Sequence, residues 1–166
     1  KKRAADALDN VCLGILAKHY PNNRAHAFLD WFTYSDNTID GQSKKKAYTF
    51  MDSNLVADED VGTVKSLQQI HAYIFGGLYD FAGQIRTKTI SKGGFTFCLA
   101  EYLPYELRKI ESMPEETIDQ IISKYIEMNV AHPFMEGNGR PTRIWLDLFL
   151  KKRLQKCIDW SRINKN

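Results

Sequence analysis

Apolar side chains recur at helical spacing in several stretches of the chain. From Thr63 onward, one apolar face returns at helical spacing, which predicts a helix that Thr63 or Ser66 could cap and near whose end Gly76-Gly77 permits an exit or a close approach. This face consists of Leu67, Ile70, His71, Ile74, Phe75 and Leu78. A single histidine on an apolar helix face is more often a packed core residue than a catalyst, and we expect this of His71.

The N-terminal third of the chain gives weaker signals. Residues 6–19 have helical apolar spacing, and the pattern stops before Pro21. Residues 33–43 are rich in Ser, Thr, Asn, Asp and Gly and predict a loop. Ala47, Phe50 and Met51 then indicate a short helix.

Two more helices are predicted in the C-terminal half. The first should start at a capping box formed by Ser112 and Glu115 and end near Ala131-His132, because Pro133 disfavours helical geometry in the residue before it. The second should begin near Pro141, a favoured first-turn position for proline, and end on cationic side chains. Their buried stripes are Ile118, Ile121, Ile122, Tyr125 and Ile126, and Ile144, Trp145, Leu148 and Phe149.

Residues 85–98 have the pattern of a β-hairpin. Two β-type runs, 85–90 and 95–98, flank the turn residues 91–94, where Gly93-Gly94 can supply positive φ angles. A single hairpin in a helical domain has no sheet to join, so it should be either a flap over a cleft or a surface excursion. We therefore predict one all-α domain with a short β-hairpin.

Composition and charge exclude several classes of protein. The 166 residues are 43% hydrophobic and 26% charged, which argues against a disordered, collagen-like or membrane protein. No apolar run approaches the ~18–20 residues that would span a bilayer, and no clean signal-peptide core follows the first residues. The net charge of +3 argues against a dedicated nucleic-acid binder. Three widely separated cysteines predict a reduced, cytoplasmic protein, which could act in a host cell if secreted.

The loop between the last two helices holds the candidate chemistry. It reads HPFMEGNGR over residues 132–140, followed by Pro141-Thr142-Arg143. Two glycines before a helix N-terminus favour an anion site, and Arg140 and Arg143 can reach successive phosphates from one helical turn. Glu136 is a hard oxygen ligand suited to Mg²⁺, and His132 can act as a general base. The residues alone predict a phosphate site with a histidine and a carboxylate.

The loop also resembles the signature of the Fic family, H-P-F-x-[D/E]-G-N-G-R-x-x-R, at every specified position. The resemblance extends to Gln69-Ile70-His71, to residues 79–86 and to residues 90–95, and covers about residues 44–163. It implies a Fic-type helical domain (residues 44–166) with a hairpin flap over the active-site cleft. Residues 1–43 form a segment whose role the resemblance leaves open.

The family implies AMP transfer from Mg-ATP to a Tyr, Thr or Ser hydroxyl of a target protein, with release of pyrophosphate. His132 would deprotonate the hydroxyl, and Glu136 would hold Mg²⁺. The ATP-binding residues would be Gly137, Asn138, Gly139, Arg140 and Arg143, with the Asn138 side chain in the anion hole. Phe134 would anchor the loop. The flap would dock the target by strand pairing through Ile90, Lys92, Gly93, Gly94 and Phe95.

The charge state of His132 is open at this stage. A histidine at a helix C-terminus is favoured in its charged form, whereas the positive potential of an anion site opposes that form. A rate that rises through about pH 6–7 is expected, near the ordinary histidine pKa of ~6.5.

Two alternative functions stay open: a kinase-like branch of the family that moves phosphate with the nucleotide reversed, and a catalytically silent partner-binding module. Many members silence themselves with a helix bearing [S/T]-x-x-x-E-[G/N], whose glutamate pairs with the second motif arginine, here Arg143. The nearest stretch, residues 37–41, has Asp40 for the glutamate and Asp36 for the Ser or Thr. An inhibitory helix could thus lie in this chain, beyond residue 166, or in a separate antitoxin. An oligomer is also compatible with the sequence.

Overall fold

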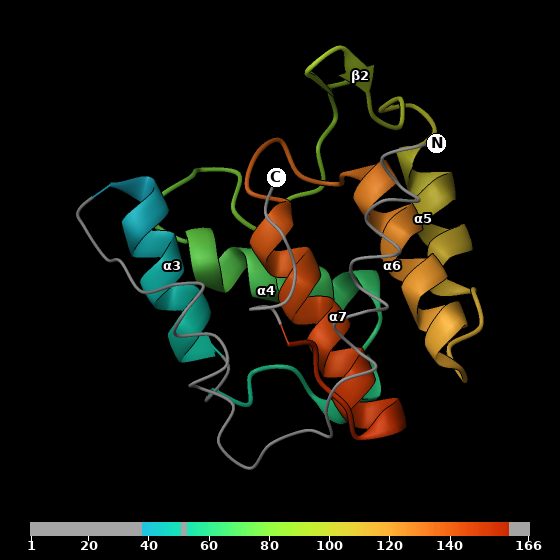
Figure 1. The fold of residues 1–166 in the computed structure, drawn as a ribbon. Helices are drawn as coiled ribbons and strands as arrows, with labels where there is room; N and C mark the ends of the chain where they lie inside the picture. The colour runs from blue at the N-terminus through green and yellow to red at the C-terminus, as the bar shows by residue number, and fades with distance from the viewer. Residues whose placement is uncertain (1–37, 51–52, 160–166) are drawn as a thin grey trace.

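The computed structural model describes residues 38–50 and 53–159. In these residues five α-helices and one two-stranded antiparallel hairpin follow one another (Figure 1). The elements are α3 (Ile39–Phe50), the 3-10 turn η1 (Asp58–Asp60), α4 (Val64–Phe75), β1 (Ser91–Lys92), β2 (Phe95–Thr96), α5 (Leu103–Glu111), α6 (Ile118–Ala131) and α7 (Gly139–Leu154). The predicted all-α class with one hairpin is confirmed. The helix predicted over residues 6–19 lies outside the described residues.

Helix α7 is the central element of the fold. It packs against both α4 and α6, while α3 packs on α4 and α5 on α6 (Figure 1). The predicted apolar stripes meet at these contacts, and Leu67, Ile122 and Trp145 are fully buried. The Trp145 indole N–H donates to Thr63 O at 3.0 Å, which satisfies its one polar atom. The core therefore fixes the two ends of α6 and α7 that flank the motif loop.

The start of α4 follows the prediction. Thr63 is the N-cap, and its side chain accepts a hydrogen bond from the Ser66 backbone N–H at 3.1 Å. The helix ends at Phe75, with Gly76 as its C-cap, so Leu78, predicted on the same face, lies beyond the helix. His71 is fully buried on the core face, so its prediction as a packed residue is confirmed.

The loop predicted over residues 33–43 is wrong from Ile39 onward, where α3 begins. The polar residues there act as a helix start: the Thr38 hydroxyl accepts the Gly41 N–H at 3.1 Å, and Asp40 lies in the first turn, where the helix dipole favours an acid. Helix α3 continues through Ala47 to Phe50. It therefore spans the boundary at residue 43 between the N-terminal segment of open role and the Fic-type domain expected from the sequence.

The capping box predicted at Ser112 and Glu115 is also wrong. Ser112 instead ends α5, a helix that the sequence analysis missed although Leu103, Leu107 and Ile110 have helical spacing and are buried. The observed capping box of α6 pairs Thr117 with Gln120. Glu115 has another role, since its carboxylate accepts from the buried Lys124 ammonium at 3.0 Å.

The hairpin is shorter than predicted and shifted. Residues 85–90 are not a strand; β1 is Ser91–Lys92, which pairs with β2 so that Ser91 lies opposite Thr96 and Lys92 opposite Phe95. Gly93 and Gly94 form the turn with φ of 57° and 76°, as the sequence predicted. The strands lie next to the turn because a two-residue turn with positive φ at both positions pairs the residues directly before and after it, here Lys92 and Phe95.

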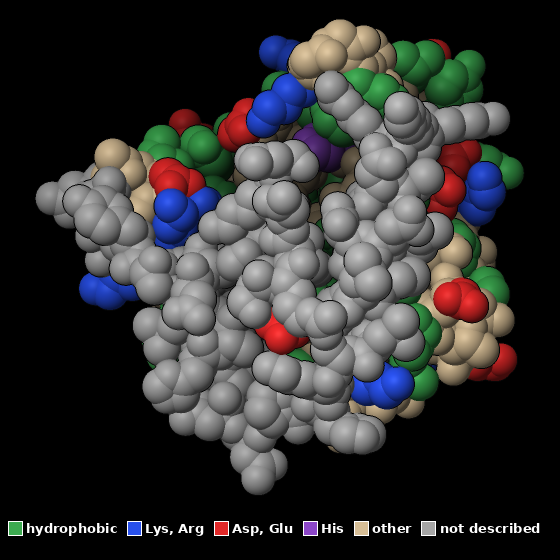
Figure 2. Space-filling view, viewed as in Figure 1, with side chains coloured by type: hydrophobic (Ala, Val, Ile, Leu, Met, Phe, Trp, Pro, Cys, Tyr) green, Lys and Arg blue, Asp and Glu red, His purple; other side chains and the backbone are tan. Residues whose placement is uncertain are grey.

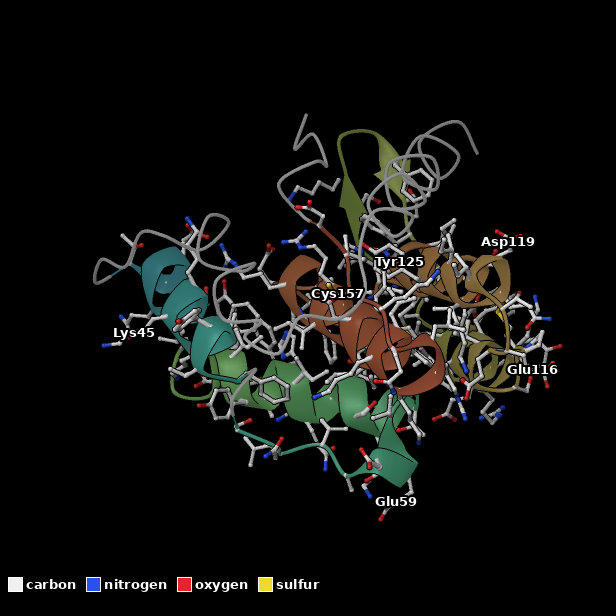
Figure 3. All side chains as sticks on the ribbon, turned by 60° about the horizontal axis from the view of Figure 1, so that its bottom comes forward. Lys45, Glu59, Glu116, Asp119, Tyr125 and Cys157 are labelled. Atoms are coloured by element: carbon white, nitrogen blue, oxygen red, sulfur yellow. The ribbon has the colours of Figure 1, made fainter. Side chains whose placement is uncertain are left out.

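No helix within the described ranges is long and apolar enough to cross a membrane. Figure 3 shows the labelled charged side chains of Lys45, Glu59 and Glu116 at the outside of the molecule, whereas Tyr125 lies inside the fold. Of the described cysteines, Cys98 is half-buried and Cys157 is buried, and both are free thiols.

Candidate active site

His132 occupies the end of α6 in a left-handed conformation, with φ of 51° and ψ of 65°. Its Nδ1 lies 3.1 Å from Asn129 O. Because a carbonyl oxygen can only accept, Nδ1 carries the proton in this contact and Nε2 is left with its lone pair. The ring also stacks on Phe97 at 3.8 Å between centroids and 14° between planes. His132 therefore presents a fixed ring with a basic nitrogen.

The pKa of His132 is lowered from its ordinary value of 6.5. Burial is the main cause, and the positive charges of Arg86 and Lys92 act in the same direction. The hydrogen bond to Asn129 O and the charge of Glu136 oppose it. The lowered pKa of His132 favours the neutral imidazole, the form that can take up a proton.

The motif loop is held together by Phe134 and Asn138. The Phe134 backbone N–H donates to Asn138 Oδ1 and the Asn138 side-chain amide donates to Phe134 O, both at 2.8 Å. Phe134 is fully buried, and its ring stacks on His71 at 3.8 Å. The Asn138 side chain, expected in an anion hole, thus also shapes the loop, and its amide keeps a second N–H beyond the one bonded to Phe134 O.

His71 connects the motif loop to the turn after α4. The Gly83 N–H donates to His71 Nδ1 at 2.9 Å, so Nε2 must carry the proton that is donated to Glu136 O, also at 2.9 Å. The carbonyl of Glu136 thus points toward the core. Because a trans peptide holds its C=O and N–H in opposite directions, the N–H of Gly137 points away from the core. Sequence reasoning recognised His71 as buried but missed this contact.

Gly137 cannot be replaced without a shift of the backbone. Its φ is +72°, and a Cβ at this position would lie 2.5 Å from the Phe75 ring. Helix α7 starts two residues later, and the first N–H groups of a helix have no partner within the helix. The loop and the helix start can therefore present backbone N–H groups to an anion.

The two motif arginines have different surroundings. Arg140 donates to Ser43 Oγ at 2.7 Å and forms an ion pair with Asp40, both on α3. Asp40 also contacts Lys44 at 2.5 Å. Arg143 is half-buried, and burial lowers its pKa to about 10, which leaves the guanidinium charged at neutral pH. Asp40 therefore pairs with the first motif arginine, not with the second as the inhibitory glutamate of the family would.

A cavity of about 410 Å³ joins the flap to the motif loop. It is lined by Ile90, Ser91, Lys92, Phe97, His132, Met135 and Glu136. The hairpin thus lies over a cleft that contains His132, in agreement with the flap interpretation and not with a mere surface excursion. Lys92, Gly93, Gly94 and Phe95 are exposed at the tip. Figure 2 shows basic and acidic side chains next to one another between α3 and the flap.

Glu136 is the candidate metal ligand. Its side chain is exposed beside His132 and has no hydrogen-bond or ion-pair partner among the described residues. Mg²⁺ is commonly held by one or two carboxylates together with substrate phosphates, so a single free carboxylate beside an anion site fits this ion. Within the described ranges, no group of three His, Cys, Asp or Glu side chains could hold a metal without such phosphates.

Comparison with known proteins decides the family. Residues 62–150, more than half of the chain and including the whole motif loop, match the family model described as Fic/DOC family. The chain belongs to the Fic/DOC family.

The similar Fic proteins include adenylyltransferases. The chain is 29% identical over 111 residues to the "Probable protein adenylyltransferase Fic" of Escherichia coli, covering 60% of this chain and 54% of that protein. It is 30% identical over 112 residues to "Protein adenylyltransferase VbhT" of Bartonella schoenbuchensis, covering 60% of this chain and 23% of that protein. The matched part is thus about half of the first relative's length and about a quarter of the second's.

Solved Fic structures share the fold. BepC from Bartonella tribocorum, crystallised with bound AMPPNP, superposes with a TM-score of 0.64 at 18% identity, covering 76% of this chain and 71% of that one. A Fic family protein from Desulfovibrio desulfuricans gives a TM-score of 0.56 at 20% identity, covering 90% and 46%. At 18–20% sequence identity these superpositions show a shared fold.

Proposed function

We propose that this Fic protein transfers AMP from Mg-ATP to a Tyr, Thr or Ser hydroxyl of a target protein. The observation that carries the proposal is the geometry of His132: Nδ1 is bonded to Asn129 O, which leaves Nε2 available, and the ring lines a cavity shared by the flap and the motif loop. Burial, which lowers the pKa of His132, supports a neutral ring there. The names of the relatives support the same reaction.

In the proposed reaction, His132 Nε2 takes the proton of the target hydroxyl. The oxygen forms a bond to the α-phosphorus of ATP, and the bond from that phosphorus to the bridging oxygen breaks, so that pyrophosphate leaves with the electron pair. His132 then loses its proton to solvent. The backbone N–H groups from Gly137 to Gly139 would stabilise the charge that grows on the α-phosphate.

The charged side chains would position the nucleotide. Glu136 would hold Mg²⁺, which neutralises phosphate charge when bound. Arg140 would bind the β-phosphate and Arg143 the γ-phosphate, which requires Arg140 to exchange Asp40 for the phosphate. Phe134 would keep the loop in place. The flap residues Ile90, Lys92, Gly93, Gly94 and Phe95 would dock the target by strand pairing, a sequence-tolerant contact.

The proposal is tested by incubating the protein with Mg-ATP, alone and with a bacterial lysate, and searching for AMP adducts by mass spectrometry. We expect an adduct that is absent with His132→Ala and still present with Arg108→Ala, a change at an exposed position on α5. A phosphate adduct would instead support the kinase-like branch. No adduct with either the wild type or Asp40→Ala, which removes the ion pair of Arg140, would support the silent binding module.

A further inference from the structure

Arg86 makes an unusual set of contacts next to the proposed site. It is only 4% exposed, yet its guanidinium donates hydrogen bonds to four backbone carbonyls. Two of them, His132 O at 2.7 Å and Ala131 O at 2.9 Å, belong to the end of α6. The other two are Lys88 O at 2.7 Å and Cys98 O at 2.6 Å. They belong to the two segments that lead into and out of the hairpin turn, residues 88–92 and 95–98, which we call the limbs of the flap.

The charge of Arg86 is balanced by the backbone. Among the described residues, no carboxylate lies within ion-pair distance of Arg86. A buried cation without an acid is costly unless other groups compensate for the lost water. Here the carbonyl end of α6, which carries partial negative charge, and four charge-assisted hydrogen bonds do so.

Only an arginine can make this set of bonds. Its planar fork carries five N–H donors, and four carbonyls around Arg86 use donors on all three of its nitrogens. A lysine has three donors on a single atom and cannot span the same carbonyls. A glutamine keeps two donors and loses the charge.

Backbone contacts extend the same connection. The Arg86 N–H donates to Pro133 O at 2.8 Å, and the Cys98 N–H donates to Val130 O at 3.3 Å. Next to them, Phe97 places its ring on His132. The limbs of the flap are thus held against the end of α6, whereas its tip at Gly93 and Gly94 is exposed.

We propose that Arg86 is a positioning residue that fixes the flap relative to His132, and so sets the position of a flap-bound target hydroxyl relative to Nε2. This inference rests on the proposed function for its consequence, but the clamp itself can be measured without any transfer reaction. Loss of the guanidinium fork would let the limbs of the flap separate from α6 and would release the backbone that holds His132 in its left-handed conformation.

The test compares Arg86→Lys and Arg86→Gln with wild type and with Arg108→Lys, which makes the same exchange at an exposed position. Amide hydrogen exchange is followed over residues 88–98 and over α4, and nitrogen NMR reports the tautomer of the His132 ring. For both Arg86 variants we expect exchange in the flap limbs to accelerate at least about tenfold while α4 is unchanged. We also expect His132 to lose its single Nδ1–H tautomer.

Several outcomes would overturn the proposal. One is unchanged flap exchange and an unchanged tautomer in Arg86→Lys; another is equal acceleration in α4 and the flap, which indicates general destabilisation. If Arg86→Gln does not fold, Arg86→Lys and the wild type still test the proposal. Unprotected amides of Phe97 and Cys98 in the wild type would show that Arg86 does not hold the flap against α6. An absent AMP adduct would contradict the proposed function and leave these readouts unaffected.

Discussion

The two histidines of the described residues have opposite tautomers, and each tautomer suits what the residue does. His71 accepts at Nδ1 and donates at Nε2 to the motif loop, so both of its nitrogens are used inside the protein. Among the described residues His132 bonds only through Nδ1, and its ring lines the cavity. This difference supports the proposal that His132, and not His71, exchanges a proton with a bound molecule.

The lowered pKa of His132 predicts its titration. Because burial favours the neutral ring, we expect the NMR midpoint of His132 to lie below the ordinary value of 6.5. The rate of AMP transfer should then rise with pH below about 6.5 and be flat from about pH 7 upward. A midpoint above 7 for the ring, or a rate that still rises between pH 7 and 8, would contradict the assignment of His132 as the base.

The contacts of His71 predict a stability effect. His71→Phe keeps an aromatic ring against Phe134 but leaves the Gly83 N–H and the Glu136 carbonyl without their partner, at a cost of about 1–3 kcal/mol for each buried group. Urea unfolding measures this loss. Lys45→Ala, an outward-pointing change on α3, should leave the free energy of unfolding nearly unchanged (Figure 3).

Acid should act on the same residue. Burial lowers the pKa of His71 in the folded state. The neutral ring therefore contributes its full stabilisation at pH values above the unfolded-state pKa of about 6.5, and this contribution is lost as the pH falls from there toward the folded-state pKa. The free energy of unfolding should therefore fall between pH 6.5 and 5, and fall less in His71→Phe. An equal decrease in both proteins would show that other groups cause it.

At the scale of elements, α3 controls access to Arg140. Asp40→Ala should remove the ion pair of this guanidinium, leaving its hydrogen bond to Ser43 Oγ, and tighten binding of Mg-ATP. Since Asp40 is 59% exposed at its side chain, its ion pair is worth only about 0.2–1 kcal/mol, so a roughly 1.5- to five-fold lower Kd is expected by calorimetry. Lys45→Ala on the same helix serves as the control. A weaker affinity in Asp40→Ala would mean that Asp40 orients Arg140 for the nucleotide instead of competing with it.

The sequence predicted elements well where one physical signal acted alone. The apolar stripes and the Thr63 cap identified α4, and Pro133 correctly ended α6. The prediction failed where two signals coincided: residues 39–43 are polar enough for a loop, but Thr38 and Asp40 use that polarity to start α3. Likewise Ser112 and Glu115 fit a capping box, but Thr117 with Gln120 forms the real one.

The site itself was predictable in residue type but not in contacts. The motif indicated which side chains could handle phosphate, and the structure brings His132 and Glu136 into one cavity. The bonds of Arg86 to Ala131 O and His132 O, and the bond of His71 to Glu136 O, join residues more than forty positions apart in the chain. Such pairs depend on the packing of α4, α6 and the flap, which no local pattern reports.

At the scale of the whole molecule, nucleotide binding should be visible as stabilisation. A ligand that binds only the folded state adds RT ln(1 + [L]/Kd), about 2.7 kcal/mol at a hundredfold excess over Kd. We expect Mg-ATP to raise the melting temperature of the wild type, with a smaller shift in Glu136→Gln if this carboxylate holds the metal. An unchanged melting temperature at millimolar Mg-ATP would contradict a nucleotide site.

The left-handed backbone at His132 affects the choice of an inactive reference protein. Alanine is poorly suited to a φ of 51°, whereas asparagine adopts this conformation readily. His132→Ala thus removes the base and adds backbone strain, so a lost reaction could reflect a loop that has relaxed. His132→Asn removes the base while the turn keeps its shape, and it is the better stable bait for capturing a target protein on the flap.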